Sequence, residues 1–211
     1  MTQRTSTSVR RVAATIAMVG VALYVLIDVV LQFLPPHYSP ISDAESNLAV
    51  GPFGWIMSIN FFGRAILSTC AIIAIALTGS TTRTKRVGMT LFGVAGVCSG
   101  ALAFFPTDIH TGGGISSTTP SGAIHITLAT AGFLAAFAAF LVLTRWIRRT
   151  PELRAAHGGA VAFVVVAAVG LASLAVTIVW VHALLGLAER VCLAGILGWA
   201  FVVSRGIRNL R

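Results

Sequence analysis

Six long apolar runs separated by short polar segments make up most of the chain. They cover residues 12–34, 53–77, 87–105, 123–143, 159–180 and 188–204. An α-helix needs roughly 20 apolar residues to cross a bilayer, and each run is close to that length. The pattern predicts an all-α, polytopic membrane protein, with residues 1–211 forming one transmembrane domain built as a six-transmembrane-helix bundle.

The composition supports a membrane protein and excludes the usual soluble classes. Of the 211 residues, 56% are hydrophobic and only 10% are charged, whereas soluble domains carry about 25% charged residues. So few charges could not keep a 22.0 kDa globule in solution. The chain is also too apolar to be disordered.

The net charge of +9 first suggests nucleic acid as a partner. However, 13 of the 15 basic residues fall in the four segments that share one side of the predicted bundle. By the positive-inside rule these segments, including the basic N-terminus 1–11, are cytoplasmic. The charge therefore predicts cytoplasmic termini in a bacterial inner membrane and indicates no nucleic-acid partner. The 13 residues are Arg4, Arg10, Arg11, Arg83, Lys85, Arg86, Arg145, Arg148, Arg149, Arg154, Arg205, Arg208 and Arg211.

The predicted membrane topology does not explain the positions of the two remaining basic residues, Arg64 and Arg190. Arg64 lies near the predicted midplane, where a charge is costly enough to mark a functional candidate. Asn60 precedes it by one helical turn on the same face, and Asp28 is the acidic residue best placed to pair with it. Two interpretations stay open for Arg64: a structural ion pair with Asp28, or a contact with an anionic group of a ligand.

Two further polar clusters lie near the outer face. Asp108 follows the end of the third run, and His125 begins the fourth. Together they could act as an acid–base pair or hold a metal, or Asp108 could only cap the helix or bind His125. Around the start of the last run lie His182, Glu189 and Arg190, where a glutamate suits the helix dipole and an arginine can reach the interface.

One outward-facing polar cavity would explain why these polar residues all fall in the outer half of the bundle. We expect Asp108 and His125 to be catalytic and the others to bind a ligand. Asp43 and Glu45 are assigned to the first outer loop. A haem between His125 and His182 would also suit the pattern, but the sequence identifies no cofactor. The residues of the cavity are Asp28, Asn60, Arg64, Asp108, His125, His182, Glu189 and Arg190.

Three functions fit this pattern. The first is binding or chemical modification of an amphipathic, lipid- or isoprenoid-like molecule that enters from the outer leaflet. The second is a small transporter, and the third is a structural or accessory subunit of a membrane complex. Membrane lipids are expected partners in each case. Gly96 with Gly100, and Ala194 with Gly198, allow close helix packing, which would serve either the bundle itself or an oligomer.

Short motifs in a defined order also point to one family. The first outer loop and second run contain Ser46, Leu48, Ala49, Gly51, Gly54, Trp55, Asn60 and Phe61. Phe105-Pro106-Thr107-Asp108, Gly122 to His125, and Gly186-Leu187-Ala188-Glu189-Arg190 with Trp199 follow. Together these motifs resemble the bacterial membrane proteins of domain-of-unknown-function family 998. The resemblance implies a six-helix membrane protein without an established activity, and it adds Ser46 and Trp55 to the candidate ligand-binding residues. Arg64 is outside the family pattern.

Overall fold

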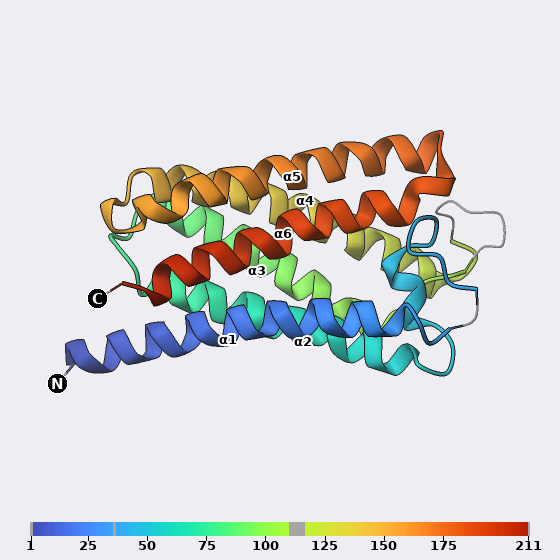
Figure 1. Ribbon diagram of the computed structural model, residues 1–211, viewed down its shortest axis with the longest axis horizontal. Helices are drawn as coiled ribbons and strands as arrows, with labels where there is room; N and C mark the ends of the chain where they lie inside the picture. Colours follow the sequence, from blue (N-terminus) through green and yellow to red (C-terminus); the bar gives the residue numbers. More distant parts are fainter. Residues whose placement is uncertain (1, 36, 110–116, 211) are drawn as a thin grey trace.

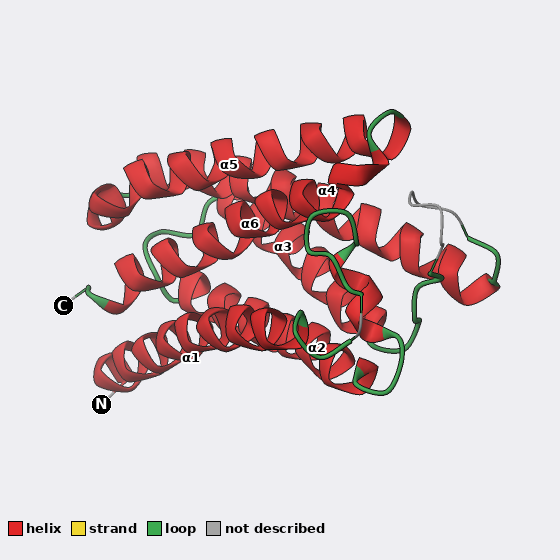
Figure 2. Ribbon diagram, turned by 45° about the vertical axis from the view of Figure 1, so that its right-hand side comes forward, coloured by secondary structure: helices red, strands yellow, loops and turns green. Residues whose placement is uncertain are grey.

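Six long α-helices form the described part of this computed structural model, which comprises residues 2–35, 37–109 and 117–210. Short 3-10 helices lie in three of the connections, and no strand occurs among these residues (Figure 2). The all-α prediction is therefore confirmed. The helices are α1 (Thr2–Leu31), α2 (Gly54–Ala76), α3 (Arg83–Leu102), α4 (Pro120–Arg148), α5 (Arg154–Val179) and α6 (Leu185–Arg208), and the 3-10 helices are η1 (Glu45–Ala49), η2 (Pro151–Leu153) and η3 (His182–Leu184).

Five of the six helices are long and apolar enough to cross a membrane. The exception is α3, whose first turn contains Arg83, Lys85 and Arg86 and whose mean hydropathy is correspondingly low. It nevertheless packs between α2 and α4 within the same bundle (Figure 1). The chain is thus an integral membrane protein of helical-bundle type.

The helix boundaries differ from the apolar runs for two physical reasons. At one end of the bundle the helices continue into polar segments, so that α1 begins at Thr2 and α4 runs to Arg148. Arginine is a good helix former, which allows this extension. At the other end α1 stops at Leu31 and α3 at Leu102, a few residues earlier than expected, because a residue that precedes proline avoids helical geometry.

Hairpins of consecutive helices make the most extensive contacts, namely α1 with α2, α3 with α4, and α5 with α6. The α6 helix also packs on α1 and lies in the middle of the bundle (Figure 1). Its Trp199 is fully buried, stacks on Phe140 with ring centroids 4.1 Å apart, and donates a hydrogen bond to Thr144 Oγ1 at 2.8 Å. By contrast, α4 and α5 contact each other much less although they are consecutive.

The first turns of α1 and the last turn of α6 lie at the same end of the bundle. There, Arg11 Nη2 donates a hydrogen bond to the carbonyl of Leu210 at 3.0 Å. We call this the termini end. The opposite end, which carries residues 37–53 and η3, is the loop end (Figure 1). The membrane topology of the two termini, and with it their cytoplasmic placement, stays a prediction.

One of the basic residues at the termini end has a structural role that topology alone does not explain. Lys85 is fully buried, and its ammonium donates hydrogen bonds to the carbonyls of Ala76 at 2.9 Å and Thr78 at 2.7 Å. Ala76 is the last residue of α2 and Thr78 lies in the turn that follows, and backbone acceptors at a helix C-terminus have no partner within the helix. Lys85 therefore caps α2 from the first turn of α3.

Candidate functional site

Residues 37–53 of the loop between α1 and α2 are bound to the loop end of α6 by Arg190. The guanidinium donates hydrogen bonds to the carbonyls of Pro40 at 3.0 Å and Asp43 at 3.3 Å, and to the Tyr38 hydroxyl. A side chain with five donors in a fixed planar arrangement suits such a set of acceptors. Arg190 therefore fixes the path of the loop.

Gly186 allows the same loop to approach the α6 backbone closely. A Cβ atom at this position would lie 2.8 Å from the carbonyl oxygen of Pro40 and still closer to that of Asp43. One residue further on, the N–H of Leu187 donates to the Ile41 carbonyl at 2.9 Å. Gly186 and Arg190 of the Gly-x-x-Glu-Arg motif thus help to hold the loop, although the motif was expected to frame a ligand site.

Docking of the loop places Glu45 inside the bundle with 3% of its surface exposed. Its backbone N–H donates to Glu189 Oε2 at 2.7 Å, and its carboxylate accepts a hydrogen bond from the Tyr24 hydroxyl at 2.9 Å. Burial raises the pKa of the Glu45 carboxyl to about 8. The sequence pattern assigned Glu45 only to an outer loop, so this central residue was missed. The signal available was its position next to Ser46 of the family pattern.

Arg64 is held by residues from three other segments. Its Nε donates to Ser99 Oγ at 2.6 Å and its Nη1 to the Tyr24 hydroxyl at 3.0 Å, while Nη1 lies 3.9 Å from Glu45 Oε2. The guanidinium also lies over the ring of Tyr24, 5.2 Å from its centroid. The charge of Arg64 in the bundle interior therefore contacts polar side chains and lies near the carboxyl group of Glu45, as such a position requires.

The expected partnership of Arg64 with Asp28 is wrong. Asp28 instead lies 3.8 Å from Arg190 Nη2 and accepts a hydrogen bond from Gln32 at 2.7 Å. Asn60, expected beside Arg64, is buried and donates to the backbone carbonyl of Tyr24 at 3.1 Å. This hydrogen bond of the Asn60 amide links α2 to α1. The rotation of each helix about its own axis decides these pairings, and the sequence did not specify it.

Asp108 stabilises the start of α4 through hydrogen bonds. Its carboxylate accepts hydrogen bonds from the backbone N–H groups of Thr118 at 2.8 Å and Thr119 at 2.9 Å, and from the Thr119 hydroxyl at 2.8 Å. Hydrogen bonds from Thr119 and Thr118 lower the pKa of Asp108 to about 2. The absence of a side chain at Gly122 leaves room for this carboxylate.

His125 is bound to the segment that follows α3 and not to Asp108. Its Nδ1 lies 2.6 Å from the carbonyl oxygen of Phe105, and only 3% of the residue is exposed. No hydrogen bond joins Asp108 and His125 within the described part of the chain, so the expected pair is not formed directly. Both residues nevertheless line the same cavity.

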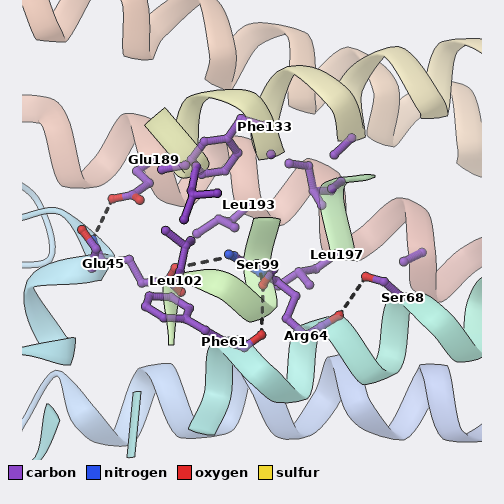
Figure 3. Close-up of a pocket in the computed structure, with 18 of the residues that line it drawn as sticks. Glu45, Phe61, Arg64, Ser68, Ser99, Leu102, Phe133, Glu189, Leu193 and Leu197 are labelled. Carbon is purple, nitrogen blue, oxygen red and sulfur yellow. Dashed lines mark hydrogen bonds and ion pairs between the residues drawn. The ribbon is translucent and has the colours of Figure 1, made fainter. Parts of the chain in front are cut away.

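Two adjoining cavities lie between the helices at the loop end. The inner cavity, of about 50 Å³, is enclosed by α2, α3, α4, α6 and η1, with Glu45, Arg64 and Glu189 on its wall (Figure 3). The outer cavity, of about 320 Å³, lies between α4, α5 and the loops. Residues common to both walls are Ser46, His125, Ala129, Phe133 and Glu189.

The remaining candidates lie away from these cavities. His182 is exposed, and its Nε2 is 2.8 Å from the Ile178 carbonyl at the end of α5. Trp55 is 64% exposed on the outside of α2, where an aromatic ring suits the membrane interface. Neither lines the cavities, whereas His125 does, so His125 and His182 do not face a common haem position. Among the described residues, no three His, Cys, Asp or Glu side chains gather as metal ligands.

The glycines of the two small-residue motifs in α3 and α6 pack against neighbouring helices of the same chain. A Cβ at Gly100 would lie 3.2 Å from that of Ala65, and one at Gly96 3.3 Å from that of Ser68, both on α2. Gly198 lies directly against Phe163 of α5. These contacts account for Gly96, Gly100 and Gly198, whereas Ala194 is exposed, and oligomerisation stays a prediction.

Comparison with known proteins identifies a family without assigning an activity. No curated protein and no protein of solved structure shows a significant match to the chain. The family model described as "Protein of unknown function (DUF998)" matches residues 18–206. That span contains all the motifs on which the resemblance was based, and it includes every residue of the two cavities. The chain therefore belongs to the DUF998 family of proteins of unknown function.

Proposed function

We propose that this protein binds an amphipathic, lipid-like molecule whose polar head occupies the inner cavity and whose tail leaves between α4 and α5. We place the loop end at the outer face of the bacterial inner membrane, so that the molecule enters from the outer leaflet. One observation carries this proposal. The inner cavity, which has polar residues on its wall, joins the outer cavity, and the outer cavity lies beside α4 and α5, which contact each other little.

The wall of the outer cavity suits a hydrocarbon chain. It includes Leu134 of α4 and Leu171 and Ile178 of α5, and Leu134 is 52% exposed on the side where lipid would lie. A tail that moves here from the bilayer gains little, because lipid chains are as apolar as leucine. Preference for one molecule over bulk lipid must therefore come from its head.

Polar groups on the same wall provide contacts for a head. Thr107, Asp108 and Asn47 line the outer cavity, and His125 and Glu189 are shared with the inner one. The head would thus lie among Glu45, Arg64, His125 and Glu189, at the depth where the two cavities join. This arrangement retains the expected ligand role of Arg64, Glu189 and Ser46.

His125 is the residue best placed for acid–base chemistry on the head. A carbonyl oxygen can only accept a hydrogen bond, so the contact with Phe105 requires a proton on Nδ1. In the neutral ring Nε2 then carries the lone pair and can accept a proton. Asp108 would act indirectly, because it holds the first turn of the helix that carries His125. It is a positioning residue in this proposal.

Photolabelling tests the proposal directly. The protein, reconstituted in lipid nanodiscs, would be irradiated with a single-chain amphiphile that carries a diazirine on its tail, and the labelled peptides would be mapped. We expect labelling concentrated in residues 126–134 and 171–178, and suppressed by an excess of the unlabelled amphiphile. Labelling spread evenly over all lipid-facing helices, unchanged by the competitor, would contradict the proposal.

A further inference from the structure

Three polar atoms of the cavity wall have no hydrogen-bond partner among the described residues. They are Nη2 of Arg64, Nε2 of His125 and Oε1 of Glu189. None belongs to the buried side-chain atoms that lack a partner, so each has surface that is not covered by protein. All three residues line the inner cavity. Their free atoms are therefore the groups that a bound head would meet.

These atoms require a head that both accepts and donates hydrogen bonds. Nη2 of Arg64 is a donor only, whereas Oε1 of an ionised Glu189 is an acceptor only. Nε2 of His125 accepts in the neutral ring, because Nδ1 carries the proton that is given to the Phe105 carbonyl. A hydroxyl group can accept from the guanidinium and donate to either of the two acceptors. An ether or a simple ester could only accept.

The charges around the cavity favour an uncharged head. Arg64 and Glu189 place a guanidinium and a carboxyl group on the wall of the same cavity. A phosphate or carboxylate head would approach the carboxyl group of Glu189. An ammonium head would approach the guanidinium of Arg64 instead. Because a charge placed beside a like charge in a low-dielectric site is strongly disfavoured, a neutral head fits best.

We infer that the ligand is a neutral lipid with a free hydroxyl on its head, such as a long-chain alcohol or an acylglycerol. This inference rests on the proposed function and adds the chemical class of the ligand. The hydroxyl accepts a hydrogen bond from Arg64 Nη2 and donates one to His125 Nε2. The tail follows the outer cavity between α4 and α5.

Competition among heads on a common tail tests this assignment. The photolabelled amphiphile would be displaced in nanodiscs by dodecanol, monododecanoylglycerol, dodecanoate, dodecyl phosphate and dodecylamine, each at the same mole fraction of the bilayer. We expect the two neutral hydroxyl compounds to displace it about tenfold more effectively than the charged ones, as one hydrogen bond to a charged group would give. Equal displacement by all five, or stronger displacement by a charged compound, would overturn the hydroxyl assignment and leave the amphiphile site intact. Failure of every compound would overturn the proposed function as well.

Two variants and a control test whether the preference for hydroxyl heads depends on the named atoms. His125→Phe keeps a ring of similar size but removes the acceptor, so the preference for hydroxyl heads should fall to less than about threefold. Glu189→Gln removes a negative charge from the wall and should improve displacement by dodecanoate. His182→Phe changes a histidine outside the cavities and should keep the wild-type order. Unchanged head preference in both cavity variants would overturn the inference even if one of them folded poorly.

Discussion

Replacing Gly186 with alanine should detach the α1–α2 loop from α6. The new Cβ would lie 2.8 Å from the Pro40 carbonyl oxygen and closer still to that of Asp43, so the two backbones must separate. Overpacking of this kind costs about 1–3 kcal/mol. Separation would also weaken the hydrogen bonds of Arg190 and Leu187 to the loop, each worth about 0.5–1.5 kcal/mol or somewhat more for the charged donor. Together these effects amount to roughly 2–4 kcal/mol after the gain from a better helix former.

Thermal unfolding in one detergent would measure this effect. For a chain of this size about 1 kcal/mol corresponds to a change of about 2–4 °C in Tm, so G186A should unfold roughly 5–15 °C lower than the wild type. At Gly158 of α5 no atom lies within 4 Å of the position that a Cβ would occupy, and G158A should leave Tm equal or slightly higher. Hydrogen exchange of residues 37–53 should accelerate in G186A alone. Equal Tm values and equal exchange in both variants would refute the docking of the loop described above.

Three other predictions concern the polar groups and access to the cavities. Because burial raises the pKa of Glu45 from 4.5 to about 8, folding should weaken between these pH values as the unfolded carboxyl ionises first. The Tm of the wild type should therefore fall relative to that of E45Q as pH rises through this range, and a constant difference would contradict it. D108N should accelerate hydrogen exchange at residues 117–125, because the carboxylate that binds the first turn of α4 is lost; unchanged exchange would exclude this role. In a cysteine-free background, a membrane-impermeant thiol reagent should label S46C from the loop side, whereas A200C should not react from the termini side. Reaction of A200C from the termini side would favour the transporter.

Hydrophobic length predicted the helical bundle because it reports directly on the cost of leaving backbone groups in lipid. It located all six helices, whereas the cytoplasmic placement of the termini, expected from the charge asymmetry, stays a prediction. The exact helix ends followed other rules, namely the geometry before Pro35 and Pro106 and the helical propensity of the polar termini. The predicted helix ends followed the apolar pattern, which was given more weight than these local rules.

The site was predictable only in part, because it depends on which way each helix faces and on how one loop folds back. The prediction brought together Arg64, His125 and Glu189, which the inner cavity does contain. It missed Glu45, because a loop residue is buried only when Arg190 binds the loop carbonyls. Trp55 was also expected to bind the ligand, but it lies on the outside of α2. The charge of Asp28 was recognised, yet its partner was assigned to the wrong helix.

The most direct test of the account is to fill the junction between the two cavities. Ala129 lines both of them, whereas Ala131, two residues further along α4, is exposed and lines neither. Competition-sensitive photolabelling by the diazirine amphiphile would be compared in A129W and A131W, after both had been shown to unfold near the wild-type Tm. The account predicts that A129W loses this labelling and A131W keeps it. Wild-type labelling in A129W would contradict the claim that the cavities hold the ligand.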